Sequence, residues 1–366
     1  MPPVYVMIKP ASGLCNMRCS YCFYADEMEK RTQSSYGIME EETLECVVRE
    51  ILDYAEGECT IAFQGGEPTL AGLPFFRRCL ELEKQYNRKH VRISHALQTN
   101  GYGLDQEWCE FLAGNHFLVG LSLDGTLATH DACRKDAKGQ GTYLRILKAA
   151  EMLKRAGAEF NILTVVNART APKIRRIYEQ YKKQGFLWQQ YIACLDPLGE
   201  RRGERDYSLT PKVYGQFLID LFDLWYLDLR QGRQPFIRQF ENYIGILAGR
   251  MPESCEQRGT CGIQHVVEAD GSVYPCDFYV LDQYRLGNLR EDNFGRLQER
   301  RKEICFVEDS FQRGEECDSC RDFPVCRGGC RRHREQQGGG NYFCQSYRMF
   351  FDACLPRMAE IARSIR

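Results

Sequence analysis

Three closely spaced cysteines near the N-terminus constrain this chain more than any other feature. They are Cys15, Cys19 and Cys22, in the pattern CxxxCxxC. Tyr21 stands directly before the last cysteine, and the strand-like apolar segment Val4–Ile8 precedes all three. Three thiolates can hold three irons of a cubane cluster and leave the fourth iron without a protein ligand. The same residues could also be three ligands of a structural zinc site with a distant fourth ligand.

An iron without a protein ligand favours a particular chemistry. It can chelate the amino and carboxylate groups of S-adenosylmethionine and pass an electron to the sulfonium, which leads to reductive cleavage and a 5′-deoxyadenosyl radical. A cluster held by four cysteines has no iron free for a cofactor. The cysteine pattern therefore predicts a [4Fe-4S] cluster that reduces S-adenosylmethionine.

A glycine-rich turn follows the second strand-like segment. It consists of Gly65, Gly66, Glu67 and Pro68. Glycines let the polar end of a ligand approach the backbone, and a carboxylate suits a cationic amino group. The turn is therefore predicted to bind the methionine end of the cofactor, and the alternative is an ordinary strand-to-helix turn.

Composition indicates a folded enzyme. The chain has 366 residues, 43% of them hydrophobic, and a formal net charge of −1, so no global field attracts nucleic acid or an anionic membrane. No apolar run reaches membrane-spanning length, and the N-terminus lacks the pattern of a secretory signal. We expect a cytoplasmic protein whose partners include neither nucleic acid nor membrane.

The chain contains nineteen cysteines, far more than the average for a protein of this length. Without a secretion signal, metal binding explains them better than a disulfide framework. Eleven fall into motif-like groups. The other eight are predicted to be small buried hydrophobic residues; they are Cys46, Cys59, Cys79, Cys109, Cys133, Cys194, Cys305 and Cys354.

Strand-like and helical segments alternate up to about residue 235, which predicts a parallel sheet with crossover helices. The predicted strands are Val4–Ile8, Thr60–Gln64, Val91–Leu97, Phe117–Leu123, Glu159–Val166 and Leu187–Ala193. The predicted helices are Glu40–Tyr54, Pro74–Asn87, Asp105–Ala113, Tyr143–Ala156, Ala171–Lys183 and Pro211–Leu229. Six units are too few for a closed eight-stranded barrel, so the α/β fold is predicted to be an open or partial one. The active site of such a fold lies at the carboxyl ends of its strands.

The polar motifs agree with that location. Gln98–Gly101 follows the third predicted strand, Ser122–Gly125 the fourth, Asn167 the fifth and Cys194–Pro197 the last. Each could be a simple turn, but their shared position at strand ends predicts one functional rim.

The rhythm of strands and helices stops beyond residue 235, and this change predicts two domains, residues 1–235 and 236–366. Besides Cys305 and Cys354, the second contains the eight remaining motif-like cysteines, namely Cys255, Cys261, Cys276, Cys317, Cys320, Cys326, Cys330 and Cys344. Eight thiolates make two four-ligand sites, either electron-transferring or structural iron–sulfur clusters or a pair of zinc sites.

Together these motifs resemble the radical S-adenosylmethionine (SAM) enzymes with a SPASM extension, a family that also shows the SLDG and HDACRKD motifs at Ser122–Gly125 and His130–Asp136. A closer resemblance, to the anaerobic sulfatase-maturating enzymes, spans nearly the whole chain. The segments that carry it are IKPASGLCNMRCSYCFY, FQGGEPTLAG, LQTNG, FLVGLSLDG, EFNILTVVN, CLDP and DGSVYPCDFYVLD. It implies a partial (β/α)₆ TIM-like barrel followed by a cysteine-rich SPASM domain with two auxiliary clusters.

The resemblance also implies a role for individual residues. The catalytic cluster would bind Cys15, Cys19 and Cys22. The cofactor pocket would include Tyr21, Gly66, Ser122, Arg134 and Leu195. One auxiliary cluster would bind Cys255, Cys261, Cys276 and Cys330, and the other Cys317, Cys320, Cys326 and Cys344. Asp277 would be the general base, although taken alone it would read as a solvated loop carboxylate.

The implied reaction is the oxygen-independent oxidation of a cysteine or serine, within the CxPxR or SxPxR motif of a sulfatase, to Cα-formylglycine. The implied partners are an unfolded or nascent sulfatase polypeptide and an electron donor such as ferredoxin or flavodoxin. Two alternatives remain. One is a SPASM enzyme that forms a thioether, an epimer or a crosslink in another peptide. The other is a zinc-stabilised interaction module without enzymatic activity.

Four arginines surround Cys330. They are Arg327, Arg331, Arg332 and Arg334. Such a run is most often a solvated charged face, and the sequence assigns it no functional role.

Overall fold

The computed structural model describes residues 4–335 and 340–365, and it divides the chain into two compact units. The first unit runs from the N-terminus to Ser122 and also contains Cys133–Phe160 and Ile263–Cys305. The second contains Leu123–Ala132, Asn161–Gly262 and the chain from Phe306 onward. Segments that are far apart in the sequence therefore share a unit.

The sheet of the first unit is mostly parallel. Its strands, within the described residues, are β1 (Val4–Ile8), β2 (Glu58–Phe63), β3 (Arg92–Thr99), β4 (Leu118–Ser122), β8 (His265–Val267), β9 (Ser272–Tyr274) and β10 (Gly287–Asn288). β1 to β4 pair in chain order and in parallel, and β8 pairs in parallel with the other side of β1. β9 and β10 continue this side as antiparallel strands. The loops that follow β1 to β4 therefore emerge at the same edge of the sheet.

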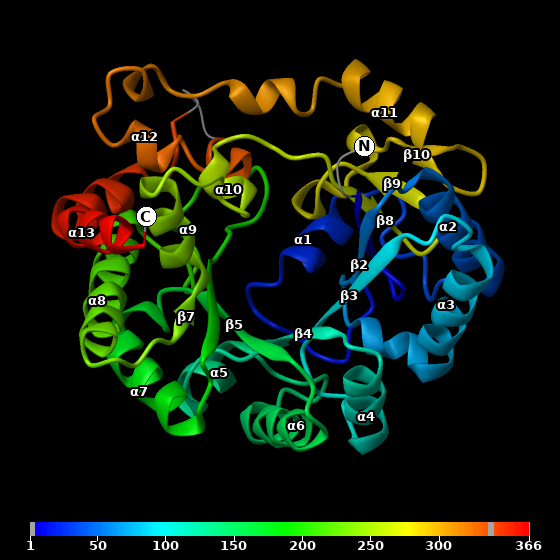
Figure 1. The fold of residues 1–366 in the computed structure, drawn as a ribbon, viewed down its shortest axis with the longest axis horizontal. Coiled ribbons are helices and arrows are strands. Elements are labelled where there is room, and N and C mark those ends of the chain that lie inside the picture. Colours follow the sequence, from blue (N-terminus) through cyan, green and yellow to red (C-terminus); the bar gives the residue numbers. More distant parts are fainter. Residues whose placement is uncertain (1–3, 336–339, 366) are drawn as a thin grey trace. The chain divides into compact units, whose positions relative to one another are not determined.

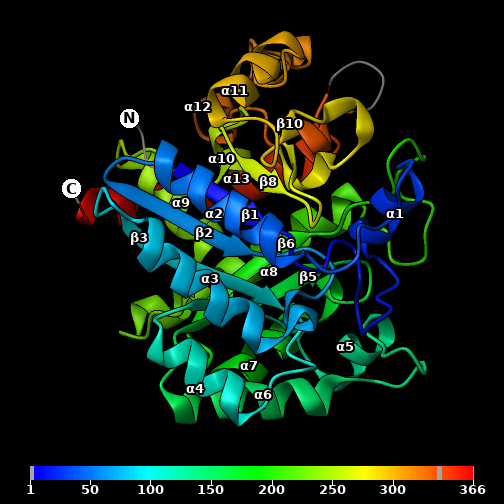
Figure 2. The ribbon, with the colours of Figure 1, turned by 90° about the vertical axis from the view of Figure 1, so that its right-hand side faces the viewer.

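Amphipathic helices cover this sheet. They are α1 (Phe23–Glu29), α2 (Glu41–Tyr54), α3 (Gly72–Tyr86), α4 (Gln106–Gly114), α6 (Tyr143–Ala156) and α11 (Phe294–Glu303). In α2 the buried residues Leu44, Val47, Val48 and Ile51 recur at helical spacing and form one apolar stripe. α2 and α3 pack against each other and run alongside β2 and β3, as Figures 1 and 2 show.

The second unit is mainly helical. Its short parallel strands are β5 (Phe160–Val166), β6 (Trp188–Ala193) and β7 (Phe236–Ile237). Its helices are α5 (Leu127–Cys133), α7 (Ile174–Gln184), α8 (Pro211–Arg230), α9 (Arg238–Leu247), α10 (Cys255–Arg258), α12 (Phe323–Cys326) and α13 (Cys344–Ser364). α8 and α13 pack along each other (Figure 1), and the Phe222 ring lies 6.0 Å from that of Phe350 between them. Buried aromatic rings thus hold the last helix in place.

All six predicted strands and six predicted helices are present, with ends that differ by at most three residues. The expectation that the pattern stops after residue 235 is incomplete. β8 joins the sheet beside β1, and α13 is a helix of 21 residues. β8 has only three residues, too few to show the alternation by which a strand is predicted.

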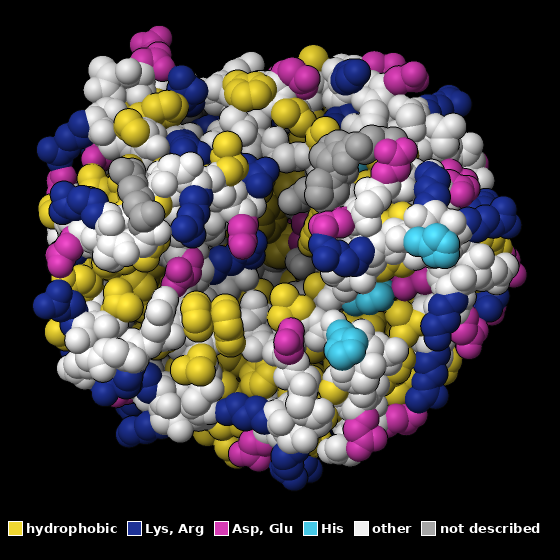
Figure 3. All heavy atoms as spheres, viewed as in Figure 1, with side chains coloured by type: hydrophobic (Ala, Val, Ile, Leu, Met, Phe, Trp, Pro, Cys, Tyr) yellow, Lys and Arg dark blue, Asp and Glu magenta, His cyan; other side chains and the backbone are white. Residues whose placement is uncertain are grey.

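The surface carries charges of both signs. Figure 3 shows acidic and basic side chains interspersed over the face that it presents. Within the described residues, the structure contains no helix that is long and apolar enough to cross a membrane.

Candidate active site

The loop that follows β1 carries the three N-terminal cysteines. Cys15, Cys19 and Cys22 are each partly exposed. The Cys15 thiol accepts hydrogen bonds from the backbone N–H of Met17 at 3.4 Å and from the side chain of Asn100 at 3.6 Å. Burial raises the pKa of Cys15 to about 11, so a bound cation is needed to keep this sulfur as a thiolate. A set of soft sulfur donors with N–H groups directed at them fits an iron–sulfur cluster.

The glycine-rich turn after β2 packs directly on this cysteine loop. Gly66 has φ +46°, and a Cβ at this position would overlap the carbonyl oxygen of Leu14, the residue before Cys15. The backbone N–H of Glu67 donates to the same oxygen at 2.8 Å. Glycine is therefore required at position 66 because the turn packs closely against the backbone of the cysteine loop.

Glu67 is held by hydrogen bonds from its own chain, and its predicted role in cofactor binding stays a prediction. Its side chain is 0% exposed, and its carboxylate accepts hydrogen bonds from Thr69, through N and Oγ1, from Thr99 Oγ1 and from Asn100 N. Three of these donors contact Oε1 and one contacts Oε2. Glu67 thus fixes the turn to the loop after β3, whose Asn100 reaches Cys15.

The predicted cofactor residues of the first unit lie at the same strand ends. Tyr21 is buried, and the guanidinium of Arg134 lies 5.5 Å from the centroid of its ring. The backbone on either side of Arg134 accepts hydrogen bonds from the cysteine loop, at the carbonyls of Cys133 and Lys135. The hydroxyl of Ser122, the last residue of β4, accepts a hydrogen bond of 3.1 Å from the side-chain amide of Gln98, near the end of β3. Leu195 belongs to the second unit, in the loop after β6.

Asp277 is a buried carboxylate, not a solvated one. It lies after β9, is 7% exposed, and its Oδ2 accepts hydrogen bonds from Tyr24 Oη at 2.6 Å and from Gln64 Nε2 at 2.8 Å. Its Oδ1 is buried and has no hydrogen-bond partner within the described part of the chain. Burial raises the pKa of Asp277, and the charge of Lys9 opposes that rise. The carboxylate therefore has one oxygen held in place and one without a donor.

Lys9, directly after β1, is a buried cation near this carboxylate. Its Nζ lies 3.0 Å from a carboxylate oxygen of Glu268, which also accepts a hydrogen bond of 2.7 Å from Arg31. Burial alone would raise the pKa of Glu268, but the two cations lower it to about 2. Glu268 is thus ionised at neutral pH and holds both cations. Sequence patterns gave no sign of this group, because its members come from distant segments.

Glu27 completes the buried charges around Lys9. The Lys9 Nζ lies 4.0 Å from Glu27. Burial raises the pKa of Glu27 to about 8, with Lys9 opposing the rise and Asp277 adding to it. Burial thus favours the protonated form of Glu27, while the charge of Lys9 acts on both Glu27 and Asp277 and lowers the pKa of each.

The C-terminal cysteines form two groups in the second unit. Cys255, Cys261 and Cys330 are close enough for each negative sulfur to raise the pKa of another. Burial raises the pKa of Cys326 to about 12, with contributions from the other members of its group, Cys344, Cys317 and Cys320. This grouping has the crossed pattern that the resemblance implies for these seven residues. Cys276 lies in the first unit, next to Asp277.

The assignment of each cysteine to a cluster remains a prediction. Among the described residues, no group of three or more histidines, cysteines or acidic residues has the geometry of a site for a single metal ion.

Six of the eight scattered cysteines are buried, as predicted. The prediction is wrong for Cys46, which is partly exposed on α2, and for Cys305, which is exposed after α11. The arginine run also differs from its prediction. Arg332 and Arg334 are buried and donate to backbone carbonyl groups, so they are not part of a solvated face.

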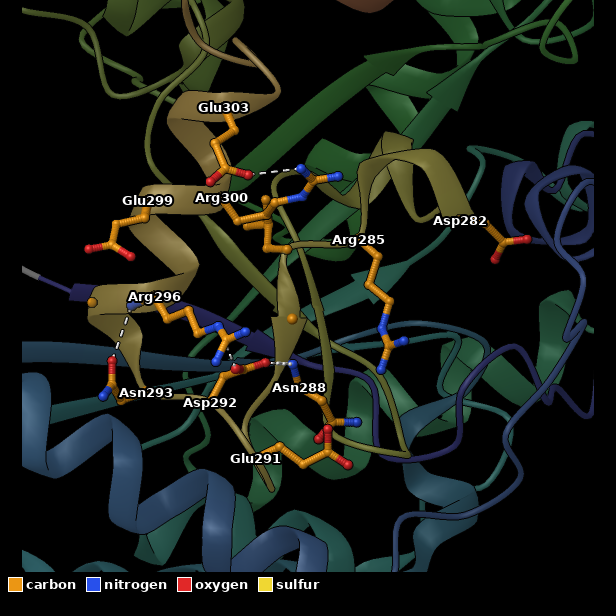
Figure 4. Close-up of a pocket in the computed structure, with 13 residues that line it drawn as sticks. Asp282, Arg285, Asn288, Glu291, Asp292, Asn293, Arg296, Glu299, Arg300 and Glu303 are labelled. Atoms are coloured by element: carbon orange, nitrogen blue, oxygen red, sulfur yellow. Dashed lines mark hydrogen bonds and ion pairs between the residues drawn. The ribbon is translucent and has the colours of Figure 1, made fainter.

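A cavity of about 950 Å³ lies elsewhere in the first unit, beside β10 and α11 (Figure 4). Its lining residues are Asp282, Arg285, Leu286, Gly287, Asn288, Glu291, Asp292, Asn293, Gly295, Arg296, Glu299, Arg300 and Glu303. Several of its charges pair within the lining, with Arg296 at 3.2 Å from Asp292 and Arg300 at 2.9 Å from Glu303. None of the predicted site residues lines it.

Comparison with known proteins identifies the family. The Radical SAM superfamily model matches residues 10–180, and the SPASM model, an iron-sulfur cluster-binding domain, matches residues 259–321. The chain is 46% identical over 370 residues to the cysteine-type anaerobic sulfatase-maturating enzyme of Clostridium perfringens strain 13, covering 100% of both chains. It is 42% identical to the cysteine-type enzyme of Clostridium novyi, covering 100% of this chain and 99% of the relative.

A more distant relative and a solved structure agree. The serine-type anaerobic sulfatase-maturating enzyme of Bacteroides thetaiotaomicron is 29% identical, over 97% of this chain and 90% of the relative. The structure of native anSMEcpe with bound AdoMet and Cp18Cys peptide superimposes with a TM-score of 0.95 at 47% identity, covering 100% of both chains. These matches confirm the predicted fold class and the S-adenosylmethionine and iron–sulfur chemistry. The chain belongs to the family of anaerobic sulfatase-maturating enzymes, which are radical SAM enzymes with a SPASM domain.

Proposed function

We propose that this chain oxidises a cysteine within the CxPxR motif of a sulfatase to Cα-formylglycine, and serine in SxPxR less well. The higher identity to cysteine-type relatives, 46% against 29% for the serine-type ones, supports the preference for cysteine. The observation that carries the proposal is the buried Asp277, whose Oδ2 is held by Tyr24 and Gln64 while Oδ1 receives no hydrogen bond from residues 4–335 or 340–365.

The residues fit the cofactors of this family. The catalytic cluster would bind Cys15, Cys19 and Cys22, whose sulfurs lie in a loop rich in N–H donors. S-adenosylmethionine would lie against Tyr21, Gly65, Gly66, Glu67, Ser122, Arg134 and Leu195. The auxiliary clusters would bind the eight C-terminal cysteines in the crossed pairing. When bound, these groups supply the radical that removes a hydrogen atom from the substrate Cβ and accept the electron that the substrate then loses.

Asp277 would take the proton that leaves the substrate. Oxidation of the CH₂SH group removes one hydrogen atom from Cβ, one proton from sulfur and one electron, and it leaves a thioaldehyde that water converts to the aldehyde. Because Tyr24 and Gln64 both donate to Oδ2, the other oxygen is free to accept this proton. Lys9 favours the ionised carboxylate that the step requires.

The physiological context follows from this chemistry. The substrate would be an unfolded or nascent sulfatase polypeptide, because the target cysteine must enter a buried site. A ferredoxin or flavodoxin would supply electrons to the catalytic cluster, and the protein would act in the cytoplasm. We also propose that the radical SAM part spans residues 1–235 and the SPASM part 236–366.

A peptide assay tests the proposal. The reconstituted protein is incubated without oxygen with S-adenosylmethionine, a reductant and a short peptide that contains CxPxR, and the products are analysed by mass spectrometry. We expect the mass loss that marks conversion of CH₂SH to an aldehyde, and no change in a control peptide with alanine in place of the cysteine. Loss of two hydrogens only, as in a thioether or crosslink, or an unchanged mass with epimerisation, would contradict the proposal and favour another SPASM reaction.

A further inference from the structure

The buried Arg332 connects two segments of the second unit that the sequence separates by more than a hundred residues. It lies in a short 3₁₀ turn, Arg331–His333, directly after Cys330, and it is 4% exposed. Its Nη2 donates to the backbone carbonyl of Asp196 at 2.8 Å, in the loop after β6. Its Nη1 lies 3.0 Å from Glu335, which balances its charge. The guanidinium is therefore fixed at both ends.

The loop after β6 holds this turn in return. Arg202 donates to the backbone carbonyls of Arg332 and His333, the latter at 3.2 Å. The loop is closed on itself, because Oδ2 of Asp196 accepts a hydrogen bond of 2.9 Å from the backbone N–H of Gly203. The two segments are thus joined by side chains that extend in both directions.

Arg332 also belongs to the turn that follows Cys330. The backbone N–H of His333 donates to the carbonyl of Cys330 at 3.0 Å and closes this turn around Arg332. The side chain of Arg332 therefore joins the turn of Cys330 to the loop of Leu195. The other arginines of the run reach different segments. Arg331 donates to Phe306 at 2.8 Å, and Arg334 donates to Ser310 at 2.6 Å.

We propose that Arg332 is a positioning residue that holds the Leu195 loop against the turn of Cys330 and thereby sets the affinity for S-adenosylmethionine. The inference rests on the proposed function, which places Leu195 in the cofactor pocket and Cys330 among the auxiliary ligands. Replacing the guanidinium by a shorter neutral group removes the bond to Asp196. The loop then samples positions in which Leu195 no longer meets the cofactor.

The test compares Arg332→Gln with Arg331→Gln in the full-length, cluster-loaded protein. The control variant removes a neighbouring arginine that donates to a different segment. Two quantities are measured, the Kd for S-adenosylmethionine by equilibrium dialysis and, without cofactor, the hydrogen-exchange rate of the Gly203 amide. We expect Arg332→Gln to raise both about tenfold, the factor expected for one lost hydrogen bond from a charged donor. Arg331→Gln is expected to leave both near the wild-type values.

A second variant keeps the test decisive if Arg332→Gln binds less iron. Arg202→Gln breaks the connection from the loop side, leaves every side chain of the turn after Cys330 unchanged, and is expected to give the same increases. Wild-type values of both quantities in Arg202→Gln, or in an Arg332→Gln protein with full iron content, would overturn the proposal. Failure of the proposed function gives a different result, since a wild-type protein that binds the cofactor but forms no aldehyde leaves the positioning role intact.

Discussion

The hydroxyl of Tyr24 lies 2.6 Å from Oδ2 of Asp277, although the two residues are separated by 253 positions in the sequence. Tyr24 belongs to the helix that follows the cysteine loop, and Asp277 to the segment after β9. The pairing of β8 with β1 brings these segments into one unit. The hydrogen bond therefore connects the predicted radical-generating loop with the predicted base.

Asp277→Asn tests the role of the base. Asparagine keeps the size of the side chain but cannot take a proton, so aldehyde formation is expected to fall by about 10²–10⁴-fold. Cleavage of S-adenosylmethionine, which does not need this proton transfer, is expected to continue. Both products are quantified in one anaerobic reaction, with Asp352→Asn, at an exposed position, as control. Persistence of aldehyde formation at the wild-type rate would show that another group is the base.

Lys9→Met tests the buried ion group. Removal of this cation leaves Glu268 without one of its two buried partners, and loss of one member of a buried pair typically costs about 3–5 kcal/mol of stability. Lys30→Met is the control, because its pair with Asp26 is partly exposed and worth at most about 1 kcal/mol. Thermal unfolding of both variants is compared under argon. Equal melting temperatures would mean that Lys9 contributes nothing beyond an exposed pair.

Glu27 predicts a pH dependence of stability. Its pKa is raised from 4.5 to about 8 by burial, so the native protein binds a proton that the unfolded chain has already lost in this range. This contribution is fully present below pH 4.5 and is lost as the pH rises to about 8, with a slope of up to about 1.4 kcal/mol per pH unit. Glu27→Gln, which cannot ionise, is expected to flatten the decline in melting temperature over this range. The exposed Glu29→Gln should keep the wild-type decline, and an unchanged decline in Glu27→Gln would refute the assignment.

Gly66→Ala tests the contact between the glycine-rich turn and the cysteine loop. A Cβ at Gly66 overlaps the Leu14 carbonyl, so we expect loss of the iron bound near Cys15 and of cofactor cleavage, with auxiliary iron retained. Gly37→Ala is the matched control, because Gly37 also has a positive φ but has open space around its Cβ position. Iron per chain and Mössbauer spectra are the measurements. Full iron content in Gly66→Ala would show that the backbone at Leu14 moves to make room for the added Cβ and that the cluster near Cys15 still binds.

Local sequence patterns predicted the helices and strands, whereas contacts between distant segments determine which side chains meet at the candidate site. The βα units were predictable because each helix and strand repeats its apolar residues over several turns or pairs, as in α2. The CxxxCxxC loop could be identified because its three cysteines are neighbours in the sequence. The place of Asp277 was not, because it depends on the pairing of β8, a strand of three residues, with β1.

Two buried side chains, Glu67 and Arg332, have partners that residue type alone does not indicate. Glu67 has the right charge for a cofactor amine, but donors from two loops surround its carboxylate. Arg332 belongs to a basic run that would ordinarily be solvated, yet a carbonyl from the loop after β6 accepts its hydrogen bond. Residue type gives the chemistry that a side chain offers, and the partners that distant segments bring decide whether it is used.

The ratio of aldehyde formed to 5′-deoxyadenosine released tests the central claim most directly. It is measured with the wild-type protein, a CxPxR peptide and S-adenosylmethionine in the absence of oxygen. The proposed function predicts that the two products form together in equal amounts, because each oxidation consumes one hydrogen-atom abstraction. Release of 5′-deoxyadenosine without any aldehyde on the peptide would contradict it.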